Sequence, residues 1–312
     1  MPHWLIKSVL QRTLSILPAS HLWNAWFQKY VTHSLDLTPE RFDTRLDFSR
    51  RHLQHFLELR PQQASGFRVL EIGTGWYPVV PVALYLCGAA QVWTFDIAPL
   101  LSRQRVQEVL ARIDQYERDG KLQKLLPRRM PERIAELRKL TLNFGHEAPQ
   151  EFLKRLSIEF RVAGAQNTGL PAHSIDLFVS TGVLEYIPRP VLAEILAECR
   201  RLGSAAATQS HYLNLVDQYS YFDRSITPFN FLKFSNRRWS YFNSPLTWQN
   251  RLRISDYRAL FSEAGYQITH ESNSSGSPAD LQSIQLAPEF QNYSTADLLV
   301  LISWLVAKPV GT

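Results

Sequence analysis

The chain has 312 residues, of which 45% are apolar and 12% aromatic, so it can bury a sizeable core in one large domain or in a domain with a cap. This composition excludes a disordered tail protein. The formal net charge is +6, but acidic and basic residues are interleaved along the chain. The charge therefore favours a mildly basic surface and argues against a dedicated nucleic-acid-binding stripe.

The two cysteines, Cys87 and Cys199, lie in apolar stretches without the spacing of metal ligands. We expect both to be buried free thiols in a reducing compartment. The chain contains no run of about 18 uncharged apolar residues, and its N-terminus lacks a compact signal-peptide core. A soluble cytoplasmic protein is therefore expected.

Helical patterns dominate the N-terminal region. Apolar residues recur at helical spacing over residues 4–17 and 21–30, which predicts two amphipathic helices. Such basic, Trp-containing helices can lie on a membrane surface, but they more often pack on a core, so peripheral membrane contact is disfavoured. A third helix is predicted to begin at Thr38-Pro39 and to end near residue 60. We expect a helical cap, residues 1–62, followed by a main domain, residues 63–312.

A glycine turn stands at the centre of the pattern, in the stretch FRVLEIGTGWYP at residues 67–78. An apolar run that carries Glu71 breaks at Gly73-Thr74-Gly75, and a helix begins near Pro78. Glycine tolerates positive φ and lets a ligand approach bare backbone, while the helix start offers unpaired N–H groups. The stretch predicts a nucleotide-type pocket, although alone it also suits a NAD-binding turn.

An acidic residue follows the glycine turn at the end of the next apolar run. The next apolar run, residues 92–95, ends in Asp96, which is 21 positions after Gly75. A carboxylate at the tip of a second strand at this distance can accept hydrogen bonds from both hydroxyls of a ribose. Asp96 is therefore the predicted ribose ligand.

The remaining pattern alternates strands and helices. Residues 100–157 are helical and highly charged, and they are too many for one connection, so we expect an inserted helical segment at 114–157. The serine-rich stretch 272–277 is expected to be a flexible loop. Further strands are predicted at residues 158–162, 175–181, 205–212, 266–271 and 298–306.

Three motifs in this order resemble those of the class I S-adenosylmethionine (SAM) methyltransferases. They are VLEIGTG at 69–75, VWTFD at 92–96 and SIDLFVSTGVLEYIP at 174–188. The resemblance covers about residues 67–308, apart from the insertion. It implies an α/β fold, with a doubly wound, Rossmann-like sheet of seven strands whose last strand is antiparallel. It also implies methyltransferase activity, with SAM as the cofactor lying across the carboxyl ends of the first strands.

The resemblance also assigns cofactor contacts to particular residues. They belong to the turn under the methionine part of SAM, the ribose position, the loop that faces adenine and the end of the fourth strand beside the reactive sulfonium. In that order the residues are Glu71, Gly73, Thr74 and Gly75; Asp96 and Ile97; Ala165 and Gln166; Thr181 and Gly182.

The sequence departs from the family pattern at two positions. Tyr77 stands where many members have a third glycine, which implies an aromatic wall beside the turn and also fits a NAD enzyme poorly. Gly164 stands where many members have an acid that accepts from the adenine amino group. Adenine recognition is therefore left to the backbone or to Gln166.

Methyl transfer from SAM is an in-line displacement in which positioning supplies most of the rate. A hydroxyl or amine acceptor also needs a base. His211 has the most suitable ordinary pKa, and Asp217 and Asp223 are the other candidates near the fifth strand. The spacing of these three residues matches no known metal site, and no metal is expected.

The acceptor is expected to be a small molecule. An aromatic-rich segment, residues 213–250, replaces a short family connection and with the N-terminal helices is predicted to form a lid. Aromatic walls suit an aromatic, apolar or sugar-like acceptor, but the same rings also suit ordinary packing. O-methylation is slightly favoured on base rates, and the oligomeric state is left open.

Other acceptors and functions are disfavoured. Residues 180–183 lack the Asn/Asp-Pro-Pro-aromatic turn of nucleic-acid base methyltransferases, so no nucleic-acid partner is expected. Protein arginine methylation usually goes with a paired-glutamate loop, and Glu185 stands alone here. The alternative function is a non-catalytic scaffold of the same fold that docks a protein partner or a membrane surface.

Overall fold

The computed structural model describes residues 3–16, 36–244 and 248–311, and the helix predicted at 21–30 lies outside them. The chain forms two compact units. Unit 1 comprises residues 1–36, 182–194 and 212–305, and unit 2 comprises residues 37–181, 195–211 and 306–312.

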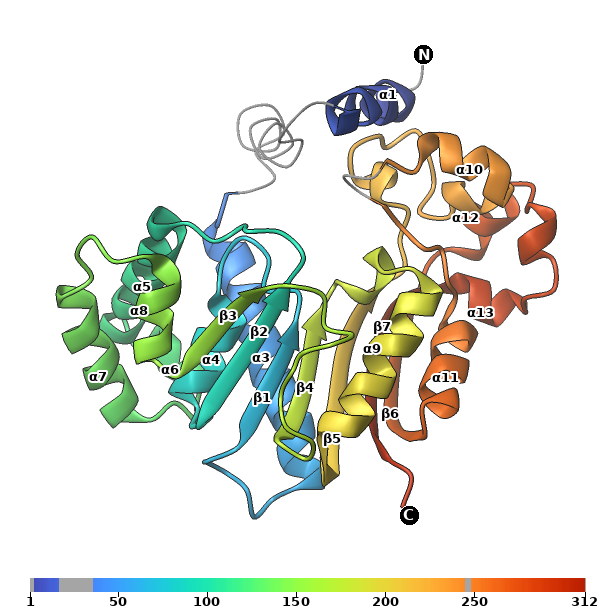
Figure 1. Ribbon diagram of the computed structural model, residues 1–312. Coiled ribbons are helices and arrows are strands. Elements are labelled where there is room, and N and C mark those ends of the chain that lie inside the picture. The colour runs from blue at the N-terminus through green and yellow to red at the C-terminus, as the bar shows by residue number, and fades with distance from the viewer. Residues whose placement is uncertain (1–2, 17–35, 245–247, 312) are drawn as a thin grey trace. The chain divides into compact units, whose positions relative to one another are not determined.

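Seven strands form one sheet in the order β3-β2-β1-β4-β5-β7-β6. In Figure 1, β7 runs in the opposite direction to the other strands, so the predicted seven-stranded, doubly wound architecture with an antiparallel last strand is confirmed. The strands are β1 (Arg68–Ile72), β2 (Gln91–Asp96), β3 (Ile158–Val162), β4 (Ile175–Thr181), β5 (Gly203–Asn214), β6 (Tyr266–Ser275) and β7 (Val300–Pro309).

The register of the parallel strands brings the ends of β1, β2 and β4 to one edge. Ile72, near the end of β1, pairs with Phe95 on one side and with Ser180 on the other. Asp96 ends β2 opposite Val162 of β3. β1 and β4 are buried along almost their whole length, as is typical of parallel strands covered on both faces.

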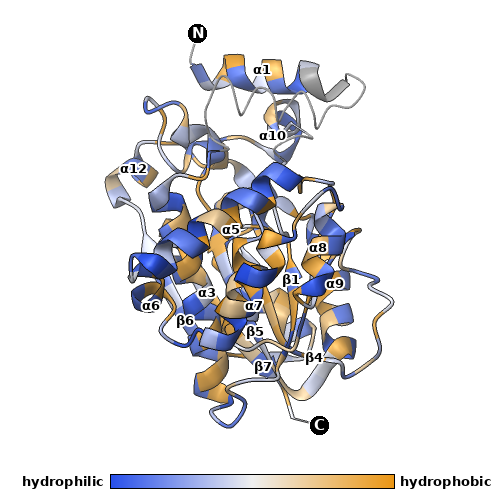
Figure 2. Cartoon of the chain, turned by 90° about the vertical axis from the view of Figure 1, so that its left-hand side faces the viewer, coloured by the Kyte–Doolittle hydropathy of each residue, from blue (hydrophilic) through white to orange (hydrophobic). Residues whose placement is uncertain are grey.

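The helices of unit 2 share one core. Apolar side chains of the predicted insertion, including Ile134, Leu137 and Phe152, lie in the same core cluster as Phe42 and Phe56. Figure 2 shows that these helices carry both hydrophilic and hydrophobic residues. The helices are α3 (Pro39–Leu59), α4 (Val79–Leu86), α5 (Arg103–Arg118), α6 (Lys121–Leu125), α7 (Pro131–Leu142) and α8 (Pro149–Arg155).

Local sequence explains where these elements begin and end. Thr38 caps α3 by accepting the backbone N–H of Arg41 at 3.3 Å, with Pro39 in the first turn, as predicted. Cys87 and Cys199 are buried free thiols, also as predicted. The expectation of a flexible serine-rich loop at 272–277 is wrong for its first part, because β6 continues to Ser275.

Two longer helices lead into strands: α9 (Arg189–Leu202) precedes β5, and α11 (Ile254–Glu263) precedes β6. The other helices of unit 1 are short, apart from the first. They are α1 (His3–Ile16), η1 (Leu184–Tyr186), η2 (Gln218–Tyr221), η3 (Asn230–Lys233), α10 (Asn236–Phe242), α12 (Pro278–Gln282), η4 (Pro288–Phe290) and α13 (Thr295–Leu299).

Unit 1 is organised around aromatic side chains. The Trp4 ring of α1 lies 5.2 Å from the Phe242 ring and 5.6 Å from the Tyr219 ring. Its backbone N–H donates to the carboxylate of Asp223 at 3.0 Å, and the Ser8 hydroxyl donates to the Phe242 carbonyl at 3.1 Å. The first helix therefore docks on the aromatic-rich segment through both apolar and polar contacts.

Two buried arginines fasten the aromatic-rich segment from within. Arg251 donates to the carbonyls of Phe231 at 2.8 Å and Phe234 at 2.6 Å, and Arg253 donates to the carbonyl of Val300 at 2.7 Å. Burial lowers the pKa of each guanidinium to about 10, so both stay charged at neutral pH. Backbone carbonyls stabilise the two guanidinium charges by accepting their hydrogen bonds. The fold of this segment therefore depends on Arg251 and Arg253.

The helix α1 belongs to unit 1 and α3 to unit 2. The boundary between a helical cap and a main domain at residue 62 stays a prediction. Within the described residues, no helix is both long and apolar enough to cross a membrane.

Replacing Trp4 by alanine tests how α1 is held. Trp4 is only 4% exposed, so we expect Trp4→Ala to cost about 3–5 kcal/mol of the free energy that holds α1 in place. Limited proteolysis should then release the N-terminal helix much faster than in the wild type. Val9→Ala is the control, because Val9 is 65% exposed on the same helix. Equal cleavage rates for Trp4→Ala and the wild type would show that the ring does not hold α1.

Candidate cofactor site

The glycine turn has the backbone conformation predicted for it. Gly73 has a φ of 81° and Gly75 a φ of 67°, which are left-handed values that favour glycine. The Gly73 N–H donates to the carbonyl of Phe95 at 2.7 Å, which fixes the turn to β2. A Cβ built on Gly75 would meet no described atom within 4 Å, so the turn faces open space.

Asp96 is joined directly to this turn. Its Oδ2 accepts the backbone N–H of Gly75 at 2.9 Å, and its Oδ1 accepts the N–H of Ala98 at 3.1 Å. Burial raises the pKa of Asp96, and these backbone N–H groups oppose the rise. Each carboxylate oxygen has further acceptor capacity, so Asp96 can also accept hydrogen bonds from a ligand.

A buried chain of side chains supports the turn from below. The Thr94 hydroxyl donates to Glu71 at 2.5 Å and is also hydrogen-bonded to Thr74 of the turn. Burial raises the pKa of Glu71 to about 7, while Thr94 and the charge of Arg45 lower it. Glu71 therefore orients Thr74 through Thr94.

The residues after the turn are held by α5. The Arg105 guanidinium lies 4.2 Å from the centre of the Trp76 ring and donates to the carbonyl of Leu100 at 2.7 Å. Tyr77, which the sequence places as an aromatic wall, is partly buried against the core of unit 2.

The residues predicted at the ribose position and in the loop that faces adenine include an exposed apolar side chain and an amide. Ile97 is 86% exposed, whereas Ala165 is buried. The Gln166 side chain folds back over Gly164, so closely that a Cβ at Gly164 would clash with its Oε1. The absence of a side chain at Gly164 therefore makes room for the Gln166 amide.

The end of β4 has a partner that the sequence did not reveal. The Nε2 of His52, on α3, lies 3.2 Å from the Thr181 hydroxyl, and its Nδ1 lies 2.9 Å from the Ser210 hydroxyl. Burial lowers the pKa of His52 well below its ordinary value, so the ring is neutral. No motif marks a histidine that lies 129 residues from its partner in the chain.

The residues predicted as bases make internal contacts. His211 is fully buried between Ser180 and Gln209, with one ring nitrogen 2.8 Å from each side chain, and burial lowers its pKa to about 3. Asp217, in unit 1, accepts the backbone N–H of Tyr219 at 2.9 Å and the side chain of Asn230 at 3.1 Å, and burial raises its pKa to about 6. A base role for either stays a prediction, and these contacts favour a structural role.

Unit 2 thus brings together the predicted residues Glu71, Gly73, Thr74, Gly75 and Asp96. Gly182 belongs to unit 1, where it has a φ of 65° and donates its N–H to the Tyr212 carbonyl at 2.9 Å.

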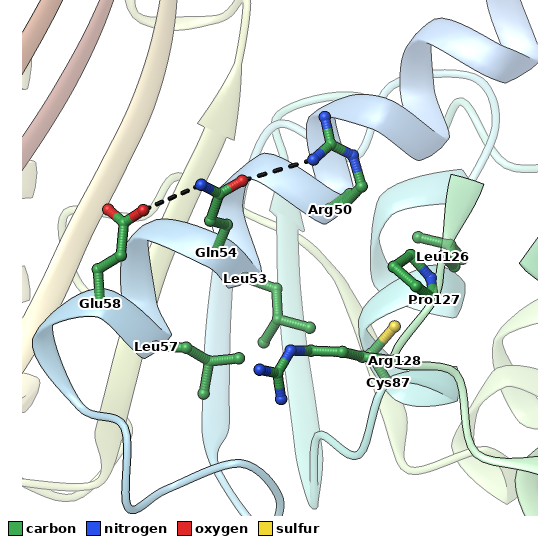
Figure 3. A pocket seen from close by; sticks show the side chains of 9 residues that line it. All are labelled: Arg50, Leu53, Gln54, Leu57, Glu58, Cys87, Leu126, Pro127 and Arg128. Carbon is green, nitrogen blue, oxygen red and sulfur yellow. Dashed lines mark hydrogen bonds between the residues drawn. The ribbon is translucent and has the colours of Figure 1, made fainter. Parts of the chain in front are cut away.

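Two cavities lie away from these residues. The larger, of about 360 Å³, is in unit 2 (Figure 3), where Leu53, Leu57 and Leu126 form its apolar part and a hydrogen-bonded row of Arg50, Gln54 and Glu58 runs along α3. The second is in unit 1 beside Trp239. Neither is lined by a predicted cofactor residue, so we do not equate either with the cofactor site.

Replacing Glu71 by glutamine tests whether burial raises the pKa of its carboxyl group. Because burial raises the pKa of Glu71 from 4.5 to about 7, the folded state binds its proton more tightly than the unfolded state does. The free energy of unfolding should therefore fall as pH rises from about 4.5 to 7, by on the order of 3 kcal/mol from this group. We expect Glu71→Gln to flatten that part of the profile in chemical denaturation. If the free energy of unfolding changed with pH in the same way in the wild type and the variant, the raised pKa of Glu71 would be contradicted.

Comparisons with known proteins find similarity in structure. The sequence matches no protein-family description and no curated protein. A SAM-dependent methyltransferase from Mesorhizobium loti is 13% identical, with a TM-score of 0.41, and the match covers 80% of this chain and 95% of that one. A SAM-dependent methyltransferase from Methanosarcina mazei is also 13% identical, with a TM-score of 0.42, and the match covers 80% of this chain and 95% of that one. Geranyl diphosphate C-methyltransferase from Streptomyces coelicolor A3(2) is 10% identical, with a TM-score of 0.47, and the match covers 84% of this chain and 77% of that one.

The strand order and the antiparallel last strand rest on the chain's own topology. By that topology, the chain has the doubly wound, Rossmann-like seven-stranded fold that the sequence resemblance predicts.

Proposed function

We propose that the protein is a SAM-dependent methyltransferase that acts on a small-molecule acceptor. The observation that carries this proposal is the hydrogen bond between Gly75 and Asp96, which places a carboxylate against a glycine turn that faces open space. A bare backbone next to a carboxylate suits an adenosyl ligand, because the backbone permits close approach and the carboxylate accepts from ribose hydroxyls.

The residues of unit 2 divide the binding between them. Asp96 accepts hydrogen bonds from the two ribose hydroxyls. The exposed side chain of Ile97 packs on the flat face of adenine. The Gln166 amide, held over Gly164, offers both a donor and an acceptor to the adenine edge. The turn at Gly73 and Gly75 receives the methionine part, and Thr74 is kept in place by Thr94 and Glu71.

The chemical step needs orientation from the protein. SAM supplies an activated methyl group with a neutral thioether as leaving group. The protein's part is to hold the acceptor in line with that methyl group, because alignment alone accounts for a large share of the rate of such displacements. His52 holds the Thr181 hydroxyl at the end of β4 and so keeps this edge of the site fixed.

We propose an aromatic, apolar or sugar-like acceptor, methylated on oxygen. Many rings of the aromatic-rich segment, including Phe229, Phe231 and Trp239, are buried in packing and so do not form a binding wall. Tyr221 is 63% exposed, and its hydroxyl accepts a hydrogen bond at 3.1 Å from the side chain of Asn214, the last residue of β5. An exposed ring with a fixed polar end suits stacking against a flat or sugar-like molecule.

Replacing Asp96 by alanine tests the cofactor assignment. We expect Asp96→Ala to weaken SAM binding about 100-fold or more, because two hydrogen bonds to a charged group are lost. Isothermal titration calorimetry measures this directly. Asp119→Ala is the control, since Asp119 is an exposed acid at the end of α5 in the same unit.

The outcomes separate the proposed function from its alternative. Full-strength SAM binding by Asp96→Ala would remove the ribose assignment. A wild-type protein that binds no SAM would contradict the methyltransferase proposal and favour the non-catalytic scaffold. Detection of a methylated product from a panel of hydroxyl-bearing small molecules would establish the acceptor class.

A further inference from the structure

Apolar side chains of α1 face outward from unit 1. Ile6 is 54% exposed, Val9 65% and Leu10 38%. Because an α-helix has 3.6 residues per turn, these three positions lie on one face of the helix and form a continuous strip, which we call the outward stripe. Single exposed apolar residues are ordinary on a protein surface, whereas a contiguous group is typical of a contact surface.

The opposite face of α1 makes the contacts within unit 1. Trp4 and Ser8 are buried on that face. The Arg12 guanidinium donates to the carbonyls of Ser240 and Tyr241 on α10, both at 2.9 Å. These bonds hold α1 beside α10, as Figure 1 also shows. The attachment of α1 thus uses one tryptophan and several polar atoms, and the outward stripe takes no part in it.

Positive charge borders the outward stripe. By helical spacing, Lys7 and Arg12 lie on its two flanks. The Lys7 ammonium is 4.7 Å from the centre of the Phe222 ring, which is itself 44% exposed. The neighbouring helix α10 adds Arg237 and Arg238, both exposed. Neither α1 nor α10 contains an aspartate or a glutamate. The two helices therefore present an apolar strip inside a positively charged border.

We propose that α1 and α10 bind the surface of an anionic lipid bilayer. The outward stripe enters the boundary between head groups and acyl chains, and the basic side chains of both helices lie against lipid phosphates. This inference is independent of the proposed function, because it concerns a surface of unit 1 and not the cofactor site.

The combination of charge and apolar surface selects this occupant. A helix that lies in a membrane interface combines an apolar face with lysine and arginine at its border. Anionic head groups attract such basic clusters, and long basic side chains can reach phosphates while their stems stay on apolar surface. Tyr241, which is 60% exposed, and Phe222 add aromatic rings of the kind that sit at head-group level.

The sequence alone disfavours membrane contact, because such helices more often pack on a core. The structure shows that α1 does pack, but through the face that carries Trp4. Packing within unit 1 and contact with a membrane therefore use different faces of the same helix.

Co-sedimentation of the whole chain with lipid vesicles tests this inference. The vesicles consist of phosphatidylcholine, with or without phosphatidylglycerol. We expect the wild type to bind the vesicles that contain phosphatidylglycerol, to bind pure phosphatidylcholine much more weakly, and to be released by high salt, because salt screens the attraction between basic side chains and phosphates.

A double variant, Ile6→Gln with Val9→Gln, removes most of the outward stripe. We expect its partition onto the anionic vesicles to fall about tenfold or more, because two apolar side chains no longer enter the bilayer. Glutamine is a good helix former and both positions are exposed, so α1 should stay docked, as limited proteolysis can verify. The matched control is Leu142→Gln, which removes an 88% exposed leucine in unit 2 and should bind as the wild type does.

A second double variant, Arg237→Gln with Arg238→Gln, tests the charge. We expect it to bind the anionic vesicles about tenfold more weakly and to bind pure phosphatidylcholine as the wild type does. This variant also decides the case in which α1 is released by the substitutions at residues 6 and 9, since it leaves α1 unchanged.

A wild type that does not bind the anionic vesicles would overturn the inference. So would unchanged binding by either double variant with α1 still docked. Self-association without lipid that Ile6→Gln with Val9→Gln abolishes would also overturn it, because a second copy of the chain would then cover the outward stripe. In each case, SAM binding measured on the same protein decides the proposed function separately.

Discussion

The hydrogen bond from the Gly75 N–H to the Asp96 carboxylate joins the first turn of the sheet to the tip of the next strand. It depends on two features of the sequence at once: a left-handed glycine that frees the backbone, and an acid that ends an apolar run. Because β1 and β2 are in parallel register, the two groups meet at one edge. The carboxylate is thereby oriented before any ligand arrives, and a ligand pays little entropy to meet it.

Buried polar groups support this edge from inside unit 2. Glu71 and Thr94 act below the turn, and His52 and His211 act near the end of β4. Burial shifts the pKa of Glu71 and of both histidines toward their neutral forms, so the edge is built largely of uncharged hydrogen-bonding groups. Such groups hold their geometry as long as each has a partner.

Much of the fold was predictable because its signals are local. The apolar run that breaks at Gly73, the cap at Thr38 and the acid at residue 96 each depend on neighbours in sequence, and the structure has them as predicted. The role of His52 was not predictable, because its contacts depend on how α3 packs. Likewise, the burial of His211 follows from the packing around β5 and not from its place at a strand end.

The central claim is that the glycine turn and Asp96 together bind an adenosyl ligand, and a crystal structure with S-adenosylhomocysteine tests it most directly. We predict electron density for the ribose within hydrogen-bond distance of the Asp96 carboxylate, with adenine against Ile97 and the amino-acid part over Gly73 and Gly75. Density for the ligand in the cavity beside α3, or a turn that stays empty at saturating ligand, would contradict the account.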